Sequence, residues 1–358
     1  MGFYFPIQTG HSASILFVSD SVTGLVKLRQ QIRDASVRSR ATGSTSVAMV
    51  SSNTLTIVNR FEVNTVVWLR SLAEGELGPS RRMTEDLEAL TATGTFVFEQ
   101  IAVADRKELL AALDSIARRS ESGLRPILQF DCHGSAEEGL LLEPSGERLT
   151  WSELVEALRP INVGTANSLC CIFGVCFGLH LSLGLSLSLA SPYFLTIAPE
   201  GEILVGELLD RLAPFYARLF ETGNITQAYR EHLAPALSIF QCTELLAKAL
   251  ATYIVKHAGG AVGAIRRERL VSRMLEERGT GNAGSAQLAS ARQRAKSSLR
   301  LTQEHLDRYA RLFLIGREPG FGIAEVERIA EGMKRSREHT KRREERSAKA
   351  RRRGRLGP

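Results

Sequence analysis

Cysteine is scarce in this sequence, with five residues among 358. The number is odd, and most of the five lie in apolar runs, whereas small secreted proteins depend on sets of paired cysteines. The pattern excludes a disulfide framework and favours a reducing, cytoplasmic location. The N-terminus also lacks a charged segment followed by an apolar stretch, so we expect no secretory signal peptide.

Charged side chains are absent from residues 169–199, which contain no Asp, Glu, Lys or Arg. A membrane span is one interpretation, since crossing a bilayer takes about 20 predominantly apolar residues. The stretch is, however, rich in Ser and Gly and contains Pro192, and fully buried parallel strands are also uncharged. We therefore favour buried strands and expect no membrane partner.

Positive charge is concentrated at one end of the chain. Residues 334–358 contain 12 Lys and Arg and three Glu, a net charge of +9, while the whole chain carries +7. Such a block is commonly disordered, and it can also bind nucleic acid through phosphate contacts. We expect a disordered basic tail over 334–358, for which a solvated and frayed helix end is the favoured interpretation and nucleic acid a possible partner.

Internal repeats and long low-complexity linkers are lacking, so the domains follow from the pattern of expected elements. Residues 1–63 form an accessory segment with candidate strands at 14–18, 46–50 and 54–58. In residues 64–258, strands alternate with helices, which predicts an α/β domain with a mostly parallel central sheet and helices on both faces. Residues 259–333 predict a helical C-terminal extension, which suits a regulatory protein partner.

The expected elements of the α/β domain follow apolar periodicity. The strands cover 65–69, 95–103, 126–133, 168–176 and 193–198, and the helices cover 84–90, 105–117, 151–158 and 202–220. Residues 139–149 predict a β-hairpin, and Thr150 is placed to cap the helix that follows.

Two reactive residues close apolar runs of this domain. His133 ends the run 126–133, Cys176 ends the run 168–176, and each has a Gly close behind it. Open α/β sheets gather reactive groups at the carboxyl ends of their strands, and a thiol beside an imidazole is a nucleophile for covalent catalysis. Taken singly, Cys176 reads as a small buried hydrophobe and His133 as a hydrogen-bonded core histidine. Taken together, they predict a catalytic Cys-His dyad.

At these residues the chain resembles the caspase-like cysteine peptidases of clan CD, in particular the bacterial branch that includes the CHAT-domain proteases. In that clan, a strand ending in His-Gly is followed by a hairpin, a helix and a strand that ends in the nucleophilic Cys. Residues 126–178 follow this order, and the likeness extends over about residues 64–258.

The resemblance implies a caspase-like three-layer fold and a thiol protease, a hydrolase that cleaves a protein or peptide substrate. It implies regulated proteolysis, such as a bacterial defence or signalling system, and an oxyanion hole made by the backbone amides of Gly134 and Cys176. The chain departs from the pattern at residues 174–178, which meet the local caspase signature only in part. Residues 179–189 alternate with period two, which is typical of a strand, where the clan has a helix.

In relatives from clan CD the end of the strand that corresponds to 193–198 borders the specificity pocket, so the resemblance implies that acidic residues here form a substrate-binding pocket that favours Arg or Lys. Asp131 shares a strand face with His133, and Glu200 follows the strand 193–198. In the alternative interpretation, Asp131 orients His133 or caps a turn, and Glu200 opens a helix, where negative charge is favoured.

Metal chemistry is disfavoured by the spacing of possible ligands. A set made of Cys132, His133, Cys176 and His180 fits none of the common zinc patterns, so we expect no metal and no cofactor. Cys132 faces away from His133 if the strand is regular, and Cys242 is expected in a helical core. The alternative function is a non-catalytic caspase-like scaffold with a nucleic-acid-associating tail.

Overall fold

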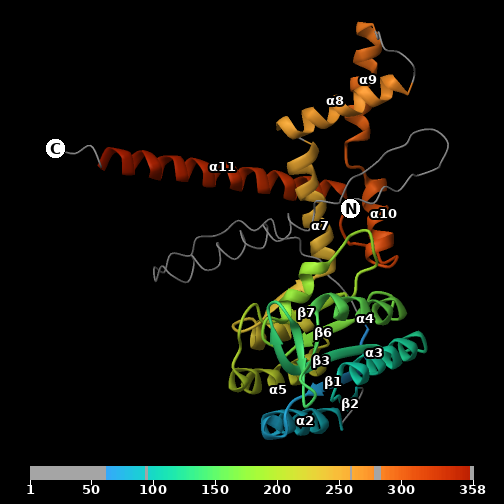
Figure 1. Cartoon of the computed structure of the whole chain (residues 1–358), viewed down its shortest axis with the longest axis vertical. Helices are drawn as coiled ribbons and strands as arrows, with labels where there is room; N and C mark the ends of the chain where they lie inside the picture. Colours follow the sequence, from blue (N-terminus) through green and yellow to red (C-terminus); the bar gives the residue numbers. More distant parts are fainter. Residues whose placement is uncertain (1–61, 93–95, 259, 278–283, 355–358) are drawn as a thin grey trace. The chain divides into compact units, whose positions relative to one another are not determined.

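The computed structural model of the chain describes residues 62–92, 96–258, 260–277 and 284–354 (Figure 1). These residues form two compact units. The α/β unit runs from residue 62 to Leu245 and includes Tyr309–Pro319, and the helical unit contains residues 246–308 and 320–354. The strands expected at 14–18, 46–50 and 54–58 lie outside the described residues.

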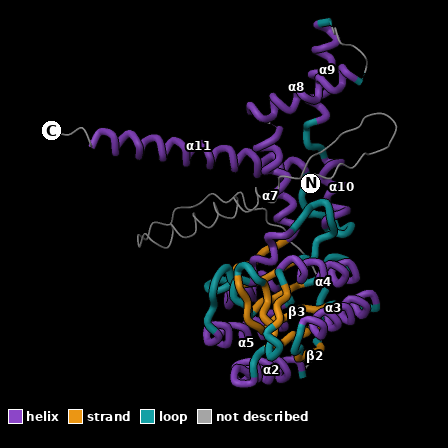
Figure 2. The backbone as a smooth tube through the Cα atoms, in the orientation of Figure 1, coloured by secondary structure: helices purple, strands orange, loops and turns teal. Residues whose placement is uncertain are grey.

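The α/β unit is built on one mixed sheet, which Figure 2 shows as orange strands between helices. Its main strands are β1 (Thr65–Ser71), β2 (Val97–Ala102), β3 (Pro126–Ser135), β6 (Cys170–Phe173), β7 (Leu195–Ala198) and β8 (Ser238–Gln241). They lie in the order β2-β1-β3-β6-β7-β8, and every neighbouring pair is parallel except β7 and β8. The expected hairpin is present as β4 (Gly139–Leu142) and β5 (Glu147–Leu149), which continues from the end of β3.

Helices cover both faces of this sheet. The main ones are α2 (Leu77–Thr91), α3 (Arg106–Glu121), α4 (Trp151–Gly164) and α5 (Val205–Thr222). On one face, Leu87 of α2 and Phe215 of α5 share a core cluster with Ile127 and Ile172 of the sheet. The arrangement confirms the expected three-layer α/β fold with a mostly parallel sheet.

The opposite face is closed by α4 and by α3, which packs beside it. Trp151 of α4 meets the ring of Phe173 edge-on at 6.4 Å, and Phe173 stacks on Phe130 at 4.6 Å. Helix α4 begins where expected, because the Thr150 hydroxyl accepts a hydrogen bond from the Glu153 N–H and the Glu153 carboxylate accepts one from the Thr150 N–H. This capping box satisfies two backbone donors at once.

The stretch after Cys176 is not a strand, so the period-two interpretation of residues 179–189 is wrong. The chain forms the 3₁₀ helix η2 (Gly178–Gly184). Leu179 and Leu181 are buried although the backbone is coiled, because alternate leucines find apolar contacts in either conformation. In the described part of the chain, no helix is both long enough and apolar enough to cross a membrane.

The helical unit begins within α7 (Cys242–Tyr253). It continues through the π-helical turn η4 (Ile254–Ala258), α8 (Gly260–Glu276), α9 (Ser285–Ser298), the first part of α10 (Gln303–Phe313) and α11 (Ile323–Gly354). Helices α8 and α9 pack around Val271, Ala291 and Ala295. The disorder expected over 334–358 is wrong as far as Gly354, because the tail is rich in helix-forming Lys, Arg, Glu and Ala and contains no Pro or Gly before that residue.

The segment Tyr309–Pro319 returns to the α/β unit, so the expected extension over 259–333 is divided between the two units. The Phe313 carbonyl accepts a hydrogen bond of 2.9 Å from the Ser191 N–H. The Arg317 guanidinium donates to the Asn167 carbonyl at 2.8 Å and lies 4.2 Å from the centre of the Phe194 ring. The expected boundary after residue 258 lies instead after Leu245, within α7.

Candidate active site

The candidate site lies where β3 leaves the parallel sheet. β3 pairs with β1 through Cys132 and with β6 through Phe130, and from His133 onward it pairs with β4 instead. His133 is therefore the first residue beyond the parallel part of the strand, at the carboxyl edge of the sheet. Reactive groups of open α/β sheets commonly lie at this edge.

Cys176 is further from its strand than the sequence predicts. β6 ends at Phe173, which is in register with Phe130, and the Gly174 N–H continues the ladder with a 2.9 Å hydrogen bond to the Phe130 carbonyl. Cys176 follows in a turn rather than at the end of a strand. The expectation that it closes the strand is wrong by three residues.

The turn that carries Cys176 packs directly against the backbone after His133. A Cβ atom added to Gly134 would lie 2.6 Å from the Cys176 carbonyl oxygen and 2.4 Å from the Cγ1 atom of Val175. Real Cβ atoms do not make such short contacts, so the approach requires a residue without a side chain. The His133 and Cys176 segments are therefore adjacent in space.

The conformation of this turn is unusual for the residues that form it. Phe177 has φ 60° and ψ 16°, a left-handed conformation that bulky side chains rarely adopt. Its N–H donates to the Gly201 carbonyl at 2.9 Å, and the Ile203 N–H donates to the Cys176 Sγ at 3.5 Å. A conformation of this kind costs about 1–3 kcal/mol and is concentrated at functional sites. The loop after β7 thus holds the turn in a strained shape beside the thiol.

Cys176 differs from the other four cysteines in its exposure. Its side chain is partly exposed, whereas the other four are buried. The buried cysteines are Cys132, Cys170, Cys171 and Cys242. Burial raises the pKa of all four thiols, so they stay protonated at neutral pH. Access favours Cys176 as the reactive thiol.

The His133 ring is paired with a residue that the sequence pattern does not reveal. Both carboxylate oxygens of Glu76 lie 2.9 Å from His133 Nε2. The hydrogen bond from His133 holds the pKa of the Glu76 carboxyl below its usual value. Glu76 lies in the 3₁₀ turn η1 (Glu74–Glu76), far from His133 in sequence, and no local motif marks it.

The His133 ring and the Cys176 thiol are not hydrogen-bonded to each other among the described residues. The thiol instead contacts the backbone of Ile203, whose carbonyl oxygen lies 3.8 Å from Sγ. Catalytic hydrogen bonds are often long or misaligned before substrate binds. Within the same described ranges, the Cys176 N–H donates no hydrogen bond.

Asp131, which we expected to line a substrate pocket, is a buried residue beside the candidate site. Asp131 is 8% exposed, and its Oδ2 atom accepts hydrogen bonds from Trp68 Nε1 at 3.2 Å and from the Ser80 hydroxyl. Burial raises the pKa of the Asp131 carboxyl, and the two hydrogen bonds oppose that rise. Through Oδ2 the carboxyl group joins β3 to β1 and α2 in the interior, and a substrate-binding role for Asp131 stays a prediction.

Glu200 lies in the loop that touches the Cys176 turn, and it is exposed. Its Oε1 atom accepts a hydrogen bond of 2.7 Å from the Ser238 hydroxyl of β8. The neighbouring Gly201 and Ile203 supply the backbone contacts to the turn. A substrate-binding role for Glu200 stays a prediction.

His180 acts as a link within the site. Its Nδ1 atom lies 2.9 Å from the Ala136 carbonyl, which follows β3, and its ring meets Phe177 edge-on at 5.7 Å. His180 therefore ties η2 to the turn after β3. No group of three or more possible metal ligands occurs among the residues that the structure describes.

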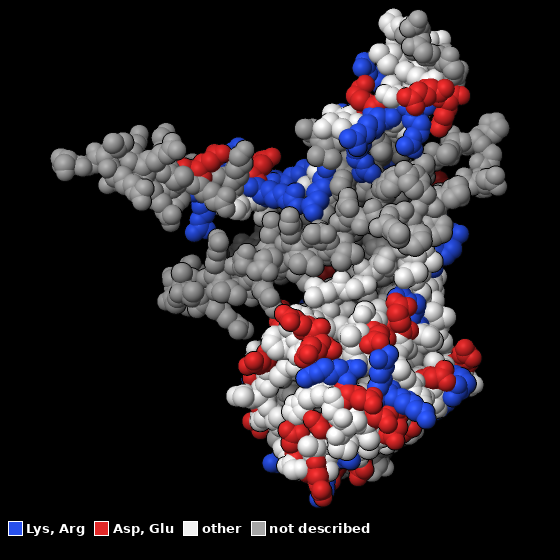
Figure 3. Space-filling view, in the orientation of Figure 1, with Lys and Arg blue, Asp and Glu red and all other residues white. Residues whose placement is uncertain are grey.

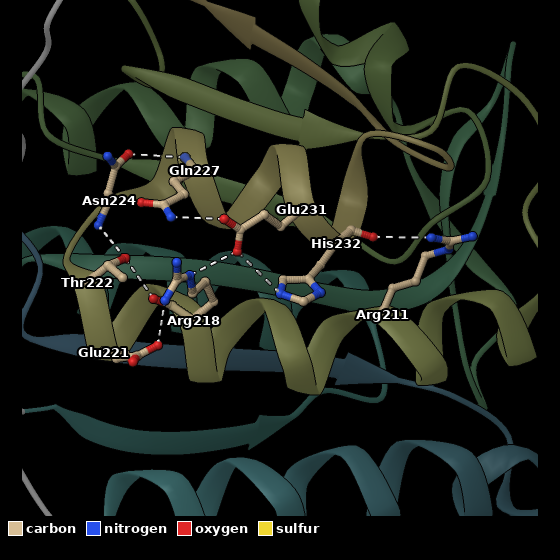
Figure 4. Close-up of polar contacts among 8 residues, drawn as sticks. All are labelled: Arg211, Arg218, Glu221, Thr222, Asn224, Gln227, Glu231 and His232. Atoms are coloured by element: carbon tan, nitrogen blue, oxygen red, sulfur yellow. Dashed lines mark hydrogen bonds and ion pairs between the residues drawn. The ribbon is translucent and has the colours of Figure 1, made fainter.

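A separate polar cluster joins α5 to the short helix α6 (Ile225–Ala228) and the π turn η3 (Tyr229–Leu233), and Figure 4 shows it. Arg218 forms ion pairs with Glu221 and Glu231, both at 2.8 Å, and Gln227 donates to Glu231 at 2.9 Å. A cavity of about 330 Å³ lies beside it, lined by Asn224, Thr226, Gln227, Arg230 and Glu231. The charges neutralise one another and no nucleophile is present, so the cluster stabilises the connection between helices.

No protein-family model matches the chain, and no curated protein matches it.

Proposed function

We propose that the protein is a caspase-like cysteine endopeptidase in which Cys176 is the nucleophile and His133 the general base and acid. The observation that carries the proposal is the close approach of Gly134 to the Cys176 carbonyl, which brings the two segments together at the carboxyl edge of the sheet. The accessibility of Cys176 among five cysteines gives further support.

The proposed reaction has two halves. His133 takes the thiol proton, and the Cys176 sulfur forms a bond to the substrate carbonyl carbon. The tetrahedral intermediate then loses its amine, which leaves with the proton that His133 carried. Water, deprotonated by His133, attacks the thioester, and the Cys176 sulfur is released with the proton returned to it.

Negative charge on the carbonyl oxygen needs preorganised donors. In this proposal the backbone N–H groups of Gly134 and Cys176 supply them. The Cys176 N–H has no hydrogen-bond acceptor within the described part of the chain, and Gly134 presents no side chain that would block the oxygen. Both features favour an oxyanion hole at this point.

The proposal extends to the setting in which the enzyme works. Free, mostly buried cysteines suit the reducing cytoplasm. A protein or peptide is the substrate, and the helical unit is the surface on which a regulatory partner acts in a bacterial defence or signalling system. The extended likeness to the CHAT-domain branch is the basis for these statements.

Incubation of the full chain with a peptide library, with mass spectrometry of the cleaved products, tests the function. The C176A and C132A variants are compared, since Cys132 is buried beside the site and serves as a matched cysteine control. Cleavage by the native protein and C132A, and none by C176A, is expected. A library left intact by the native protein would favour the non-catalytic scaffold.

A second candidate function concerns the basic helix α11. Figure 3 shows Lys and Arg side chains gathered around α8 and the first part of α11. The side chains of residues 335–340 are exposed, and the helix continues through the charged run to Gly354. We propose nucleic acid as the partner of residues 334–354 of this helix, because this run has net positive charge and contains no aromatic residue and no apolar stripe for a membrane surface.

A further inference from the structure

We propose that Glu76 is a positioning residue of this site, which fixes the proton of His133 on Nε2 and leaves Nδ1 as the nitrogen that takes the Cys176 proton. The inference rests on the proposed peptidase function, and it adds a third residue to the pair of His133 and Cys176. Neither the sequence pattern nor the likeness to caspase-like peptidases points to Glu76.

The ring nitrogens are distinguished by the contact with Glu76. Both carboxylate oxygens lie 2.9 Å from Nε2, and an ionised carboxylate only accepts hydrogen bonds. Nε2 therefore carries the hydrogen. In a neutral imidazole the other nitrogen then has the lone pair, so Nδ1 is the base. Once His133 gains a second proton, the facing carboxylate stabilises the positive ring, as the acidic member of a catalytic triad does.

Glu76 is itself held in place by its own turn. Its Oε2 atom accepts a hydrogen bond from the Ala73 N–H at 3.3 Å, which closes the 3₁₀ turn η1. The hydrogen bonds from His133 and Ala73 both lower the pKa of the carboxyl group. The group therefore stays ionised at neutral pH, as an acceptor for the ring must.

A buried hydrogen bond between Ser80 and Asp131, called the anchor below, aligns α2 with β3 beside the exposed pair of Glu76 and His133. Ser80, four residues after Glu76, donates to Asp131, which lies two residues before His133 on the same strand face. Four residues advance a helix by about 6 Å, and two residues advance a strand by about 6.7 Å. The spacings match, so the Glu76–His133 and Ser80–Asp131 contacts can form at the same time. Glu76 and Ser80 come from η1 and α2, and their two partners come from β3.

The burial of the anchor explains why the exposed pair is ordered. Ser80 is 1% exposed and Asp131 8% exposed, whereas the side chains of His133 and Glu76 are 46% and 45% exposed. An exposed ion pair alone contributes little, because ordering two side chains costs entropy. The contact between Ser80 and Asp131 fixes the backbone of both elements beforehand, so less freedom is lost when Glu76 meets His133.

The test compares E76Q with E74Q in the full chain. Glu74 is an exposed carboxylate in the same turn without a contact to His133. E76Q should lower kcat about 10- to 100-fold, as loss of a residue that orients a metal-binding histidine does, with little change in KM. E74Q should match the native protein. Circular dichroism and thermal melting confirm that both variants are folded.

A spectroscopic readout follows the ring itself. Nitrogen-15 NMR of the His133 imidazole distinguishes Nε2–H from Nδ1–H, and the glutamine amide of E76Q, which donates as well as accepts, should mix the two tautomers. Measured in the C176A background, this readout requires no turnover. If the native protein cleaves no peptide while the tautomer still depends on Glu76, the peptidase function fails and the orientation of the ring by Glu76 stands.

Two results would overturn the role of Glu76. One is native kcat and native ring signals in E76Q. The other is a rise in kcat, since Glu76 would then hold the ring away from Cys176. A double-mutant cycle with S80A adds a check on the anchor: the effects of S80A and E76Q on kcat should be less than multiplicative, because both act through the orientation of His133.

Discussion

Gly134 and the Cys176 carbonyl oxygen approach each other so closely that a methyl group at position 134 would lie 2.6 Å from that oxygen. The contact joins the end of β3 to the turn after β6, and it is the point at which the two halves of the candidate site meet. The end of β3 and the turn after β6 therefore depend on each other for their positions. A substitution that adds one methyl group at position 134 tests this contact.

G134A should therefore displace the Cys176 turn. Overpacking of this kind costs about 1–3 kcal/mol, which denaturant unfolding measures directly. Peptidase activity should also fall, since the alanine disturbs a proposed oxyanion donor. G206A is the matched control, because a Cβ atom at Gly206 in α5 meets nothing within 4 Å. Unchanged stability and activity in G134A would show that the two segments are further apart.

C176A and H133A should each abolish peptide cleavage and leave the fold intact, because the members of a catalytic unit fail singly. The variants C132A and C242A remove buried thiols and should keep activity, with some loss of stability. Product analysis after overnight incubation checks this prediction. Residual cleavage by C176A at the native rate would assign the nucleophile to another residue.

Thiol modification should discriminate among the five cysteines. Iodoacetamide should label Cys176 first in the folded protein, because the other four are buried and burial raises their pKa. Peptide mapping by mass spectrometry gives the order of labelling, and labelling in denaturant gives the reference in which all five react. Early labelling of Cys132 would contradict the packing around β3.

The pH dependence of stability should report on Asp131. Burial raises its pKa in the folded protein above the ordinary value of 3.8, so its stabilising contribution is fully present below that value and is lost as pH rises through the folded pKa. D131N removes this titration. The free energy of unfolding of the native protein relative to D131N should fall with rising pH across that window.

Urea unfolding at a series of pH values measures this difference. D86N replaces an exposed carboxyl group on α2 and serves as control, with a nearly constant difference from the native protein. A difference for D131N that rises with pH would mean that the ionised carboxylate is the favoured form in the interior.

Deletion of residues 334–358 should weaken binding to a DNA duplex and flatten its dependence on salt. Each lost phosphate contact reduces the slope of log K against log salt by about 0.9. Peptide cleavage should persist, because the deletion lies in the helical unit. Fluorescence anisotropy at several salt concentrations provides the slopes. Unchanged slopes would show that any site that binds the DNA phosphates lies outside the tail.

The parts of the fold that could be predicted from the sequence are those with a local cause. The apolar runs of β1 and β3 and the cap at Thr150 depend on neighbouring residues, as does the end of α5 at Gly223, where φ is 63°. β8 could not be predicted, because its four residues are only half-buried and it joins the sheet from a distant part of the chain.

The candidate site could be predicted only in part for the same reason. His133 and Cys176 are marked by the strands that precede them, whereas Glu76 reaches His133 from a turn more than fifty residues earlier. The burial of Asp131 depends on Trp68 and Ser80, which the sequence does not connect with it. Contacts of this kind follow from the assembled layers and leave no local pattern.

The return of Tyr309–Pro319 to the α/β unit affects the order in which the protein folds during synthesis. Ser191 and Asn167 meet their partners Phe313 and Arg317 only after the ribosome has made all of residues 246–308. At about 5–20 residues per second, this delay lasts several seconds. During that time the Phe194 ring lacks the Arg317 side chain that covers it, so the nascent sheet presents apolar surface to chaperones until residues 309–319 have been translated.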